Sequence, residues 1–269
     1  MTNSTPLFGD AYLPKEIAHR VEHLGVAKAN MDAFTLLLLA ILAGAFISLG
    51  ALFYTVVMTG SELGFGVTRF IGGLAFCLGL VLVVIGGAEL FTGNNLLAMA
   101  WASRLISTRA LLRNWLIVYA GNVIGCLGTV VLVSWAGIGN MQEGQVGEMA
   151  IRIADGKENL SFLATFSRGI LCNALVCLAV WLAMGGRTLT DKFLAILLPI
   201  SAFVTMGFEH SIANWFFLPY ALVLDSSGQI TFEGAAINII ASTLGNIVGG
   251  TLLVAGVYWV AFLRKSSSR

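Results

Sequence analysis

The chain has 269 residues, of which 58% are hydrophobic and 11% charged, with a formal net charge of +1 and a mean hydropathy of +0.89. So few charges cannot cover the outside of a soluble core that buries this much apolar surface. The composition excludes an ordinary soluble domain, and the balanced charge gives no sign of nucleic-acid binding. The sequence therefore predicts an all-α protein embedded in a lipid bilayer.

Six apolar stretches are long enough to cross the roughly 30 Å hydrocarbon core of a bilayer as helices. These transmembrane helices are expected at 34–58, 67–90, 115–135, 162–184, 193–222 and 237–262, and the second and fifth are expected to be broken. They form one membrane domain at 31–264, after a cytoplasmic amphipathic segment at 1–30 and before a cytoplasmic tail at 265–269.

The basic residues predict the orientation. With six spans both termini lie on one side, and that side carries eleven of the fifteen lysines and arginines. The positive-inside rule therefore places both termini in the cytoplasm, and the predicted location is a prokaryotic cytoplasmic (inner) membrane, crossed several times.

Residues 14–28 are expected to form an amphipathic helix, with Ile17, Val21 and Leu24 on its apolar face. His19 and His23 have the i, i+4 spacing that can hold a metal ion. Because no third ligand is apparent nearby, a solvated helix face is the favoured interpretation, and no metal site is predicted.

Two expected spans carry ionisable residues in apolar surroundings. Glu209 and His210 lie between the apolar runs 193–203 and 215–222, and Glu89 lies near the end of the second span. An ionisable group at bilayer depth costs a few kcal/mol, so it usually faces a bundle interior or a water-filled path. The two polar breaks suggest a permeation site.

The two halves repeat weakly, with an offset near 120 residues. Gly121-Asn122 in the third span corresponds to Gly245-Asn246 in the sixth, and the acidic breaks have a similar offset. Three spans per half predict that the halves enter the membrane in opposite directions, as an inverted 3+3 repeat. Half-helix N-termini that point inward favour an anion. For Asn173 and Asn246, whose amides need partners in lipid, lining or bracing a polar path is favoured over helix packing.

The chain resembles the formate/nitrite transporter family over nearly its whole length, and within it most resembles the formate channels. The resemblance is carried above all by Gly-Phe-Glu-His-Ser-Ile-Ala-Asn at 207–214 and Leu-Gly-Asn-Ile-Val-Gly-Gly at 244–250. Further matching segments lie at 72–80, 89–94, 113–122, 172–181 and 189–192.

This resemblance implies an aquaporin-like protomer in a homopentamer, with a pore in each protomer. It assigns His210, Thr92 and Glu209 to the centre of the pore and its protonation, and Glu89 to the helix break. Helix-end capping is the leading interpretation of Glu89, and for Glu209 a structural role is weighed equally with a direct one. The resemblance also implies hydrophobic constrictions at Phe76, Leu80, Leu90 and Phe203, pore asparagines at Asn173 and Asn246, and anion attraction by Lys157.

The predicted function is a channel for small monovalent anions, foremost formate, which crosses as formic acid if a central histidine protonates it. Nitrite or hydrosulfide as the main substrate remains open as an alternative. A membrane enzyme that uses Glu209 and His210 is a weaker one, because no nucleophile or metal motif accompanies them. No cofactor is predicted. A water or glycerol pore is disfavoured because no Asn-Pro-Ala motif occurs in the sequence.

Overall fold

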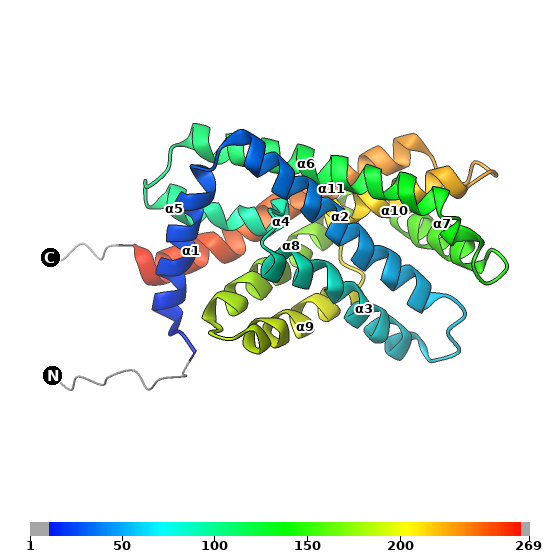
Figure 1. Ribbon diagram of the computed structural model, residues 1–269, viewed down its shortest axis with the longest axis horizontal. Coiled ribbons are helices and arrows are strands. Elements are labelled where there is room, and N and C mark those ends of the chain that lie inside the picture. The colour runs from blue at the N-terminus through cyan, green and yellow to red at the C-terminus, as the bar shows by residue number, and fades with distance from the viewer. Residues whose placement is uncertain (1–10, 265–269) are drawn as a thin grey trace, which may run out of the picture.

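The computed structural model describes residues 11–264, and within that range every regular element is helical (Figure 1). In chain order the helices are α1 (Pro14–Ala29), α2 (Ala33–Met58), α3 (Phe65–Gly86), α4 (Phe91–Asn94), α5 (Ala98–Ala102), α6 (Thr108–Trp135), α7 (Gln145–Glu158), α8 (Phe162–Gly185), α9 (Leu189–Thr205), α10 (Ser211–Leu224) and α11 (Phe232–Val248). Short turns η1 (Asn95–Leu97) and η2 (Ile138–Asn140) join some of them, and wider π-helical turns continue α11 as η3 (Gly249–Gly256) and η4 (Trp259–Leu263).

Five helices in the described range are long and apolar enough to cross a membrane. They are Ala33–Met58, Phe65–Gly86, Thr108–Trp135, Phe162–Gly185 and Phe232–Leu263. The stretch expected as the fifth span, 193–222, is not one long helix: its residues belong to α9 and α10, with the non-helical segment 206–210 between them.

The expected second span also ends earlier than the apolar pattern suggested. α3 stops at Gly86 because Gly87 adopts a left-handed conformation with φ of 83°. Residues 87–90 are not helical, and α4 begins at Phe91. A second left-handed glycine, Gly207 with φ of 70°, lies directly after α9.

Side chains fix where the longer helices begin. Asp32 accepts hydrogen bonds from the first amides of α2, and Ser107 and Ser161 do the same for α6 and α8. Thr188 forms a capping box with Asp191 at the start of α9. These polar caps stand at the ends of apolar helices, where free amide groups need partners.

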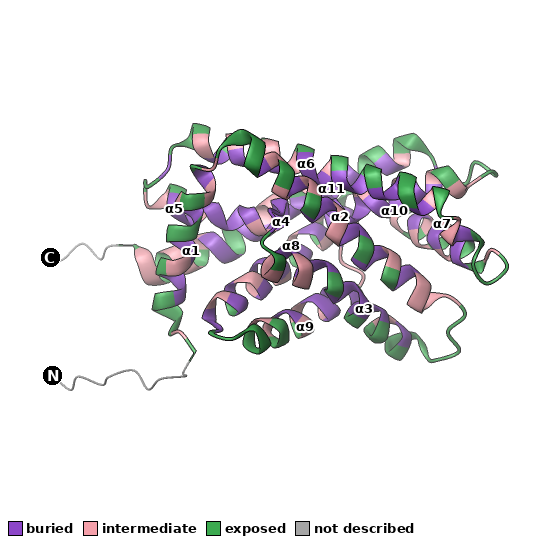
Figure 2. Ribbon diagram, viewed as in Figure 1, coloured by how far each residue is buried: buried purple, intermediate pink, exposed green. Residues whose placement is uncertain are grey.

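The helices pack in the same pairs in both halves of the chain, with α2 against α6 and α8 against α11. Glycines allow the close approach: a Cβ atom at Gly125 would collide with the Ile41 carbonyl, and one at Gly249 with the Ile170 carbonyl. α3 and α9 also lie side by side, and the buried residues gather where α2, α4, α8 and α10 meet (Figures 1 and 2).

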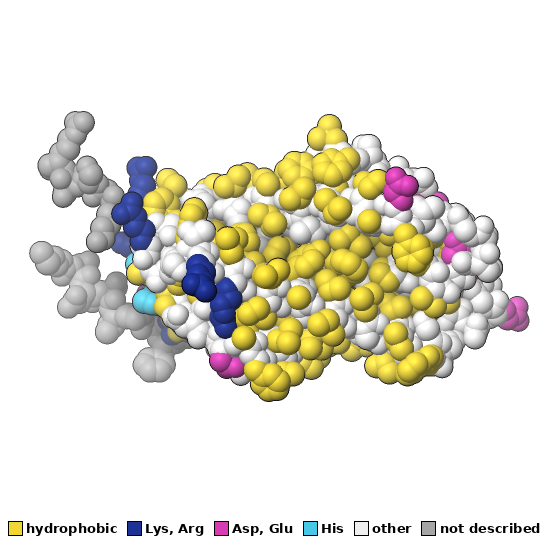
Figure 3. All heavy atoms as spheres, turned by 90° about the horizontal axis from the view of Figure 1, so that it is seen from above, with side chains coloured by type: hydrophobic (Ala, Val, Ile, Leu, Met, Phe, Trp, Pro, Cys, Tyr) yellow, Lys and Arg dark blue, Asp and Glu magenta, His cyan; other side chains and the backbone are white. Residues whose placement is uncertain are grey.

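Apolar side chains cover the middle of the surface shown in Figure 3, while lysines and arginines gather toward one end. Large apolar side chains such as Trp135, Leu116 and Leu163 are 71–82% exposed. Such a band is typical of a protein whose middle contacts lipid or other membrane helices.

The helix expected at 14–28 is α1, which buries Ile17 and Val21. Leu24, expected on the same apolar face, is instead 38% exposed. It packs against α5, α8 and the C-terminal turns of the chain, so both ends of the described chain lie at one end of the molecule (Figure 1). Residues 1–10 and the tail at 265–269 lie outside the described residues.

Candidate functional site

The centre of the molecule holds a hydrogen bond between Thr92 and His210. Thr92 lies in the first turn of α4, and His210 is the N-cap residue of α10. Their side chains are 0% and 3% exposed, and Thr92 Oγ1 lies 3.0 Å from His210 Nε2. The non-helical residues before each short helix bring these two positions together.

The other ring nitrogen of His210 fixes its tautomer. The backbone N–H of Ala213 donates to Nδ1 at 3.1 Å, so Nδ1 acts as an acceptor. The proton of the neutral imidazole then resides on Nε2, which donates to the Thr92 hydroxyl. Protonation of Nδ1 would remove the cap from α10.

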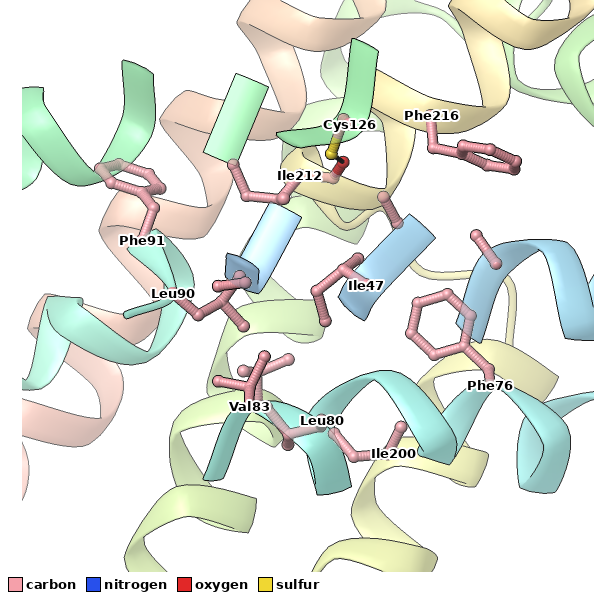
Figure 4. Packing of buried hydrophobic residues seen from close by; sticks show 14 of the residues in the cluster. Ile47, Phe76, Leu80, Val83, Leu90, Phe91, Cys126, Ile200, Ile212 and Phe216 are labelled. Atoms are coloured by element: carbon pink, nitrogen blue, oxygen red, sulfur yellow. Dashed lines mark hydrogen bonds between the residues drawn. The ribbon is translucent and has the colours of Figure 1, made fainter. Parts of the chain in front are cut away.

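Apolar side chains lie on both sides of this pair. The rings of Phe76 and Phe203 meet edge to face with centroids 5.6 Å apart, and Phe203 stacks on His210 with centroids 5.9 Å apart. Figure 4 shows Phe76 and Leu80 along α3 in one cluster with Leu90. All four predicted constriction residues are at most 3% exposed.

Two cavities approach the apolar cluster. The α7-side cavity, of about 270 Å³, is lined by Phe76, Phe203 and His210 together with residues of α7. The α1-side cavity, of about 240 Å³, is lined by Leu80 and Leu90 together with residues of α1. Among the described residues none lines both cavities, so apolar side chains separate them.

The predicted acids are held in two matching clusters. Glu209 accepts from Lys157 Nζ at 3.0 and 3.1 Å and from Asn214 at 2.7 Å. Glu89 pairs with Lys28 at 3.0 Å and accepts from Asn94 at 2.7 Å. In each cluster the asparagine that donates to the glutamate also donates to a second asparagine. Asn214 donates to Asn238 Oδ1, and Asn94 donates to Asn114 Oδ1.

These clusters show what the acids and Lys157 do in the fold. Among the described residues no hydrogen bond joins the Glu209 carboxylate to the His210 ring. Lys157 lines the α7-side cavity, and its ammonium is bound to Glu209. Five residues of these clusters were not predicted as site residues: Lys28, Asn94, Asn114, Asn214 and Asn238. Equal Glu-to-Asn spacings, 89 to 94 and 209 to 214, were the available signal.

The two predicted pore asparagines use their amides within the protein. Asn246 donates to the carbonyls of Gly169 and Glu209 and accepts from Ser211 N. Asn173 donates to Asn246 O at 2.7 Å and to an asparagine of η1 at 2.9 Å. Its Oδ1 is buried without a partner among the described residues. Both therefore brace the backbone around the two short helices.

Two arginines that were not predicted as site residues also line the α7-side cavity. Arg69 donates to the Val204 and Thr205 carbonyls at the end of α9, and Arg168 donates to the Gly207 carbonyl. Their positions depend on contacts more than 35 residues away in the sequence, such as the 39-residue separation of Arg168 and Gly207.

Comparisons with known proteins find relatives that match most of the chain. The family model described as formate/nitrite transporter matches residues 15–260. The chain is 40% identical to the formate channel FocA of Escherichia coli (strain K12), covering 96% of each chain. It is 35% identical to formate channel FocA of Haemophilus influenzae, covering 92% of this chain and 93% of the relative.

Two solved structures share the fold. A pentameric formate channel with formate bound is 42% identical and matches with a TM-score of 0.80, over 86% of this chain and 98% of that one. An ion channel of the same family is 28% identical with a TM-score of 0.84, over 91% of this chain and 98% of that one. The chain belongs to the formate/nitrite transporter family.

Proposed function

We propose that this protein is a channel that passes formate across the bacterial cytoplasmic membrane. The observation that carries the proposal is the buried Thr92–His210 hydrogen bond, placed beside the apolar side chains that separate two cavities. The names of the relatives support formate over nitrite or hydrosulfide, and they are channels rather than enzymes.

In the proposed architecture the chain crosses the membrane six times. α3 with α4, and α9 with α10, form broken second and fifth spans in an inverted 3+3 repeat, and both termini are cytoplasmic. Residues 31–264 form the channel domain of an aquaporin-like protomer, and the pentameric relative supports a homopentamer. The segment 1–30 and the tail 265–269 lie on the cytoplasmic side, with α1 packed at the α1-side cavity.

The apolar side chains determine what can pass. Phe76 and Phe203 form the constriction at the α7-side cavity, and Leu80 and Leu90 form the one at the α1-side cavity. Apolar rings exclude hydrated ions, and an unpaired carboxylate pays a large desolvation cost there. A small anion that leaves one cavity for the other therefore needs a compensating charge or a proton.

His210 supplies that compensation in the proposed mechanism. Its Nε2–H donates to Thr92 at rest, and the same N–H can turn its hydrogen bond to an arriving carboxylate. To act as the acid, the ring first takes up a proton from solution at Nδ1, which displaces the hydrogen bond from Ala213 N and makes it an imidazolium. Transfer of its Nε2 proton to formate then gives neutral formic acid, which crosses the second constriction at lower cost, and leaves a neutral ring. The cap on Nδ1 keeps the resting ring neutral, because an imidazolium cannot accept from Ala213 N.

The remaining site residues hold this centre in place. Asn246 and Asn173 brace the non-helical backbone, and the Glu89 and Glu209 clusters brace the two breaks. Lys157 contributes to anion attraction by neutralising Glu209 at the α7-side mouth.

The test measures the flux of formate, nitrite and hydrosulfide into proteoliposomes at two pH values, for wild type and His210→Asn. Formate flux that exceeds the other two, and loses its pH dependence in the variant, supports a formate channel with His210 as the protonation switch. Equal flux of all three anions makes the protein a general weak-acid anion pore. No flux in the wild type overturns the proposal.

A further inference from the structure

The α7-side cavity contains an excess of positive charge that the central histidine does not explain. Four cationic side chains line it, namely Arg69, Arg152, Lys157 and Arg168, and one carboxylate, Glu209. Lys157 is paired with that carboxylate. Arg152 is paired with Glu148 at 3.6 Å. Two arginines remain, Arg69 and Arg168, and neither has a carboxylate partner among the described residues.

These two guanidinium groups converge on one point. A Cβ atom built on Gly207 would lie 3.1 Å from Arg69 Nη2 and 3.8 Å from Arg168 Nη1. Both guanidinium groups thus lie beside Gly207, where a side chain would press on Arg69 Nη2 and where the chain turns with a φ of 70°. Like charges held this close repel one another unless a counter-ion joins them.

The contacts that hold the arginines offset only part of this charge. Arg69 donates to the carbonyls of Thr205 at 2.9 Å and Val204 at 3.0 Å, and Arg168 donates to that of Gly207 at 3.3 Å. The C-terminal end of a helix such as α9 carries about half a negative charge. The two guanidinium groups carry two positive charges, so the helix end neutralises only part of them. Each guanidinium also keeps N–H groups that donate to no acceptor among the described residues.

We propose that Arg69 and Arg168 form an anion-binding site in the α7-side cavity, which holds a small monovalent carboxylate before it reaches Phe76 and Phe203. The planar N–H pairs of a guanidinium match the two oxygens of a carboxylate. This inference rests on the proposed function for the identity of the carboxylate as formate. It assigns the uncompensated charge at this mouth to the two arginines, since Lys157 is occupied by Glu209.

Arg168 is the better position for a test. It makes one hydrogen bond to the backbone, at 3.3 Å, whereas Arg69 makes two shorter ones that end α9. Arg168→Gln removes the charge and Arg168→Lys keeps it, while both remove the guanidinium geometry. Arg152→Gln is the matched control, because it removes a cation from the same cavity that is already paired with Glu148.

The first readout is the thermal unfolding midpoint of the full chain in detergent, as sodium formate replaces sodium gluconate at constant ionic strength. A ligand that binds the folded state raises the midpoint with its concentration. We expect the formate-dependent rise to persist in wild type and Arg152→Gln, to be smaller in Arg168→Lys, which keeps the charge without the paired N–H groups, and to be lost in Arg168→Gln.

The second readout is the rate of formate uptake into proteoliposomes against formate concentration. Arg168→Gln is expected to raise KM about tenfold, the loss of one charge-assisted hydrogen bond, with the maximal rate within about twofold of wild type. Unchanged formate dependence of both midpoint and KM in Arg168→Gln overturns the site and leaves the channel function standing. A wild type that passes no formate, but whose midpoint still rises with formate through Arg168, overturns the function and leaves the site standing.

Discussion

Asn122 and Asn246 make the same three hydrogen bonds in the two halves of the chain. Each side chain accepts from the first amide of a helix, α4 or α10, and donates to the carbonyl of the glutamate that lies two residues before it. Each also donates to a carbonyl of the long helix packed against its own. The partners are Phe91 N, Glu89 O and Ala40 O for Asn122, and Ser211 N, Glu209 O and Gly169 O for Asn246, all at 2.8–2.9 Å.

Replacing Asn246 by alanine is expected to destabilise the protein by about 2–4 kcal/mol, because it leaves a buried N–H and two buried carbonyls without this partner. Asn246→Asp should also destabilise, since its carboxylate would face two carbonyl oxygens. Thermal unfolding in detergent measures both changes. Asn159→Ala, at an exposed helix end, is the control and should change stability by no more than about 0.5 kcal/mol. An Asn246→Ala midpoint equal to that of the control would contradict the bracing role.

Thr92→Val tests the hydrogen bond at the centre. Valine keeps the shape of threonine but leaves the Nε2–H of His210 without an acceptor in a buried position. The lost bond, about 1 kcal/mol, predicts a roughly fivefold lower formate flux at neutral pH and an altered dependence of flux on pH. Thr92→Ser keeps the hydroxyl, so its formate flux and the pH dependence of that flux should match those of wild type. Equal pH profiles for Thr92→Val and wild type would remove Thr92 from the mechanism.

The apolar pattern predicted the long helices well. The spans expected at 34–58 and 162–184 correspond to α2 (Ala33–Met58) and α8 (Phe162–Gly185), because an uninterrupted apolar run in lipid can only be helical. The end of the second span was misplaced by four residues, since hydropathy does not detect the left-handed turn at Gly87. α7 was not predicted, because its 14 residues are amphipathic rather than apolar.

The sequence suggested some residues of the candidate site, and their roles in a pore remain predictions. His210, Thr92 and the four constriction residues followed from family motifs, and the structure brings Thr92 and His210 into contact. The ion pairs of Lys28 with Glu89 and of Lys157 with Glu209 join residues 61 and 52 positions apart. Sequence alone gives no distance between such residues, and a lysine outside the apolar spans looks solvated until its partner is known.

Gly207→Ala is expected to lower the free energy of unfolding by more than the cost of holding alanine in a left-handed backbone conformation. A non-glycine residue in the left-handed region costs roughly 1–2 kcal/mol, and here the added methyl would also press on Arg69 Nη2 at 3.1 Å. Gly228 is the matched control, with φ of 76° and no atom within 4 Å of its Cβ position. The difference between the two alanine variants in thermal unfolding isolates the contact. If both alanine variants lose the same stability, the Arg69 side chain moves away from the added methyl without cost, and the contact contributes nothing.

Asp225 gives a pH-dependent stability outside the membrane-spanning helices. Hydrogen bonds from the Ser227 hydroxyl and from the Ile230 and Ser227 amides lower the pKa of its carboxyl from 3.8 to about 2. A lowered pKa means that the charged form is favoured in the folded state, so this stability is present above pH 3.8 and is lost as the pH falls through about 2. Asp225→Asn should therefore lower the thermal unfolding midpoint at pH 7. The difference in midpoint between wild type and the variant should disappear as the pH falls from 4 to 2. Glu62→Gln, an exposed acid, should show no such convergence.

Phe203→Ala tests the constriction at the α7-side cavity. Removing the ring takes away its contacts with Phe76 and His210 and opens space between that cavity and the centre. The variant should admit bulkier carboxylates such as lactate, raising their flux relative to formate, and should lose about 3–5 kcal/mol of stability. Phe203→Leu keeps most of the apolar volume and should stay close to wild type in selectivity. Phe70→Ala, whose side chain is 42% exposed on α3, controls for the loss of any phenyl ring. Because a loss of folding lowers all fluxes together, only a changed ratio of lactate to formate flux supports the constriction, and an unchanged ratio in Phe203→Ala contradicts it.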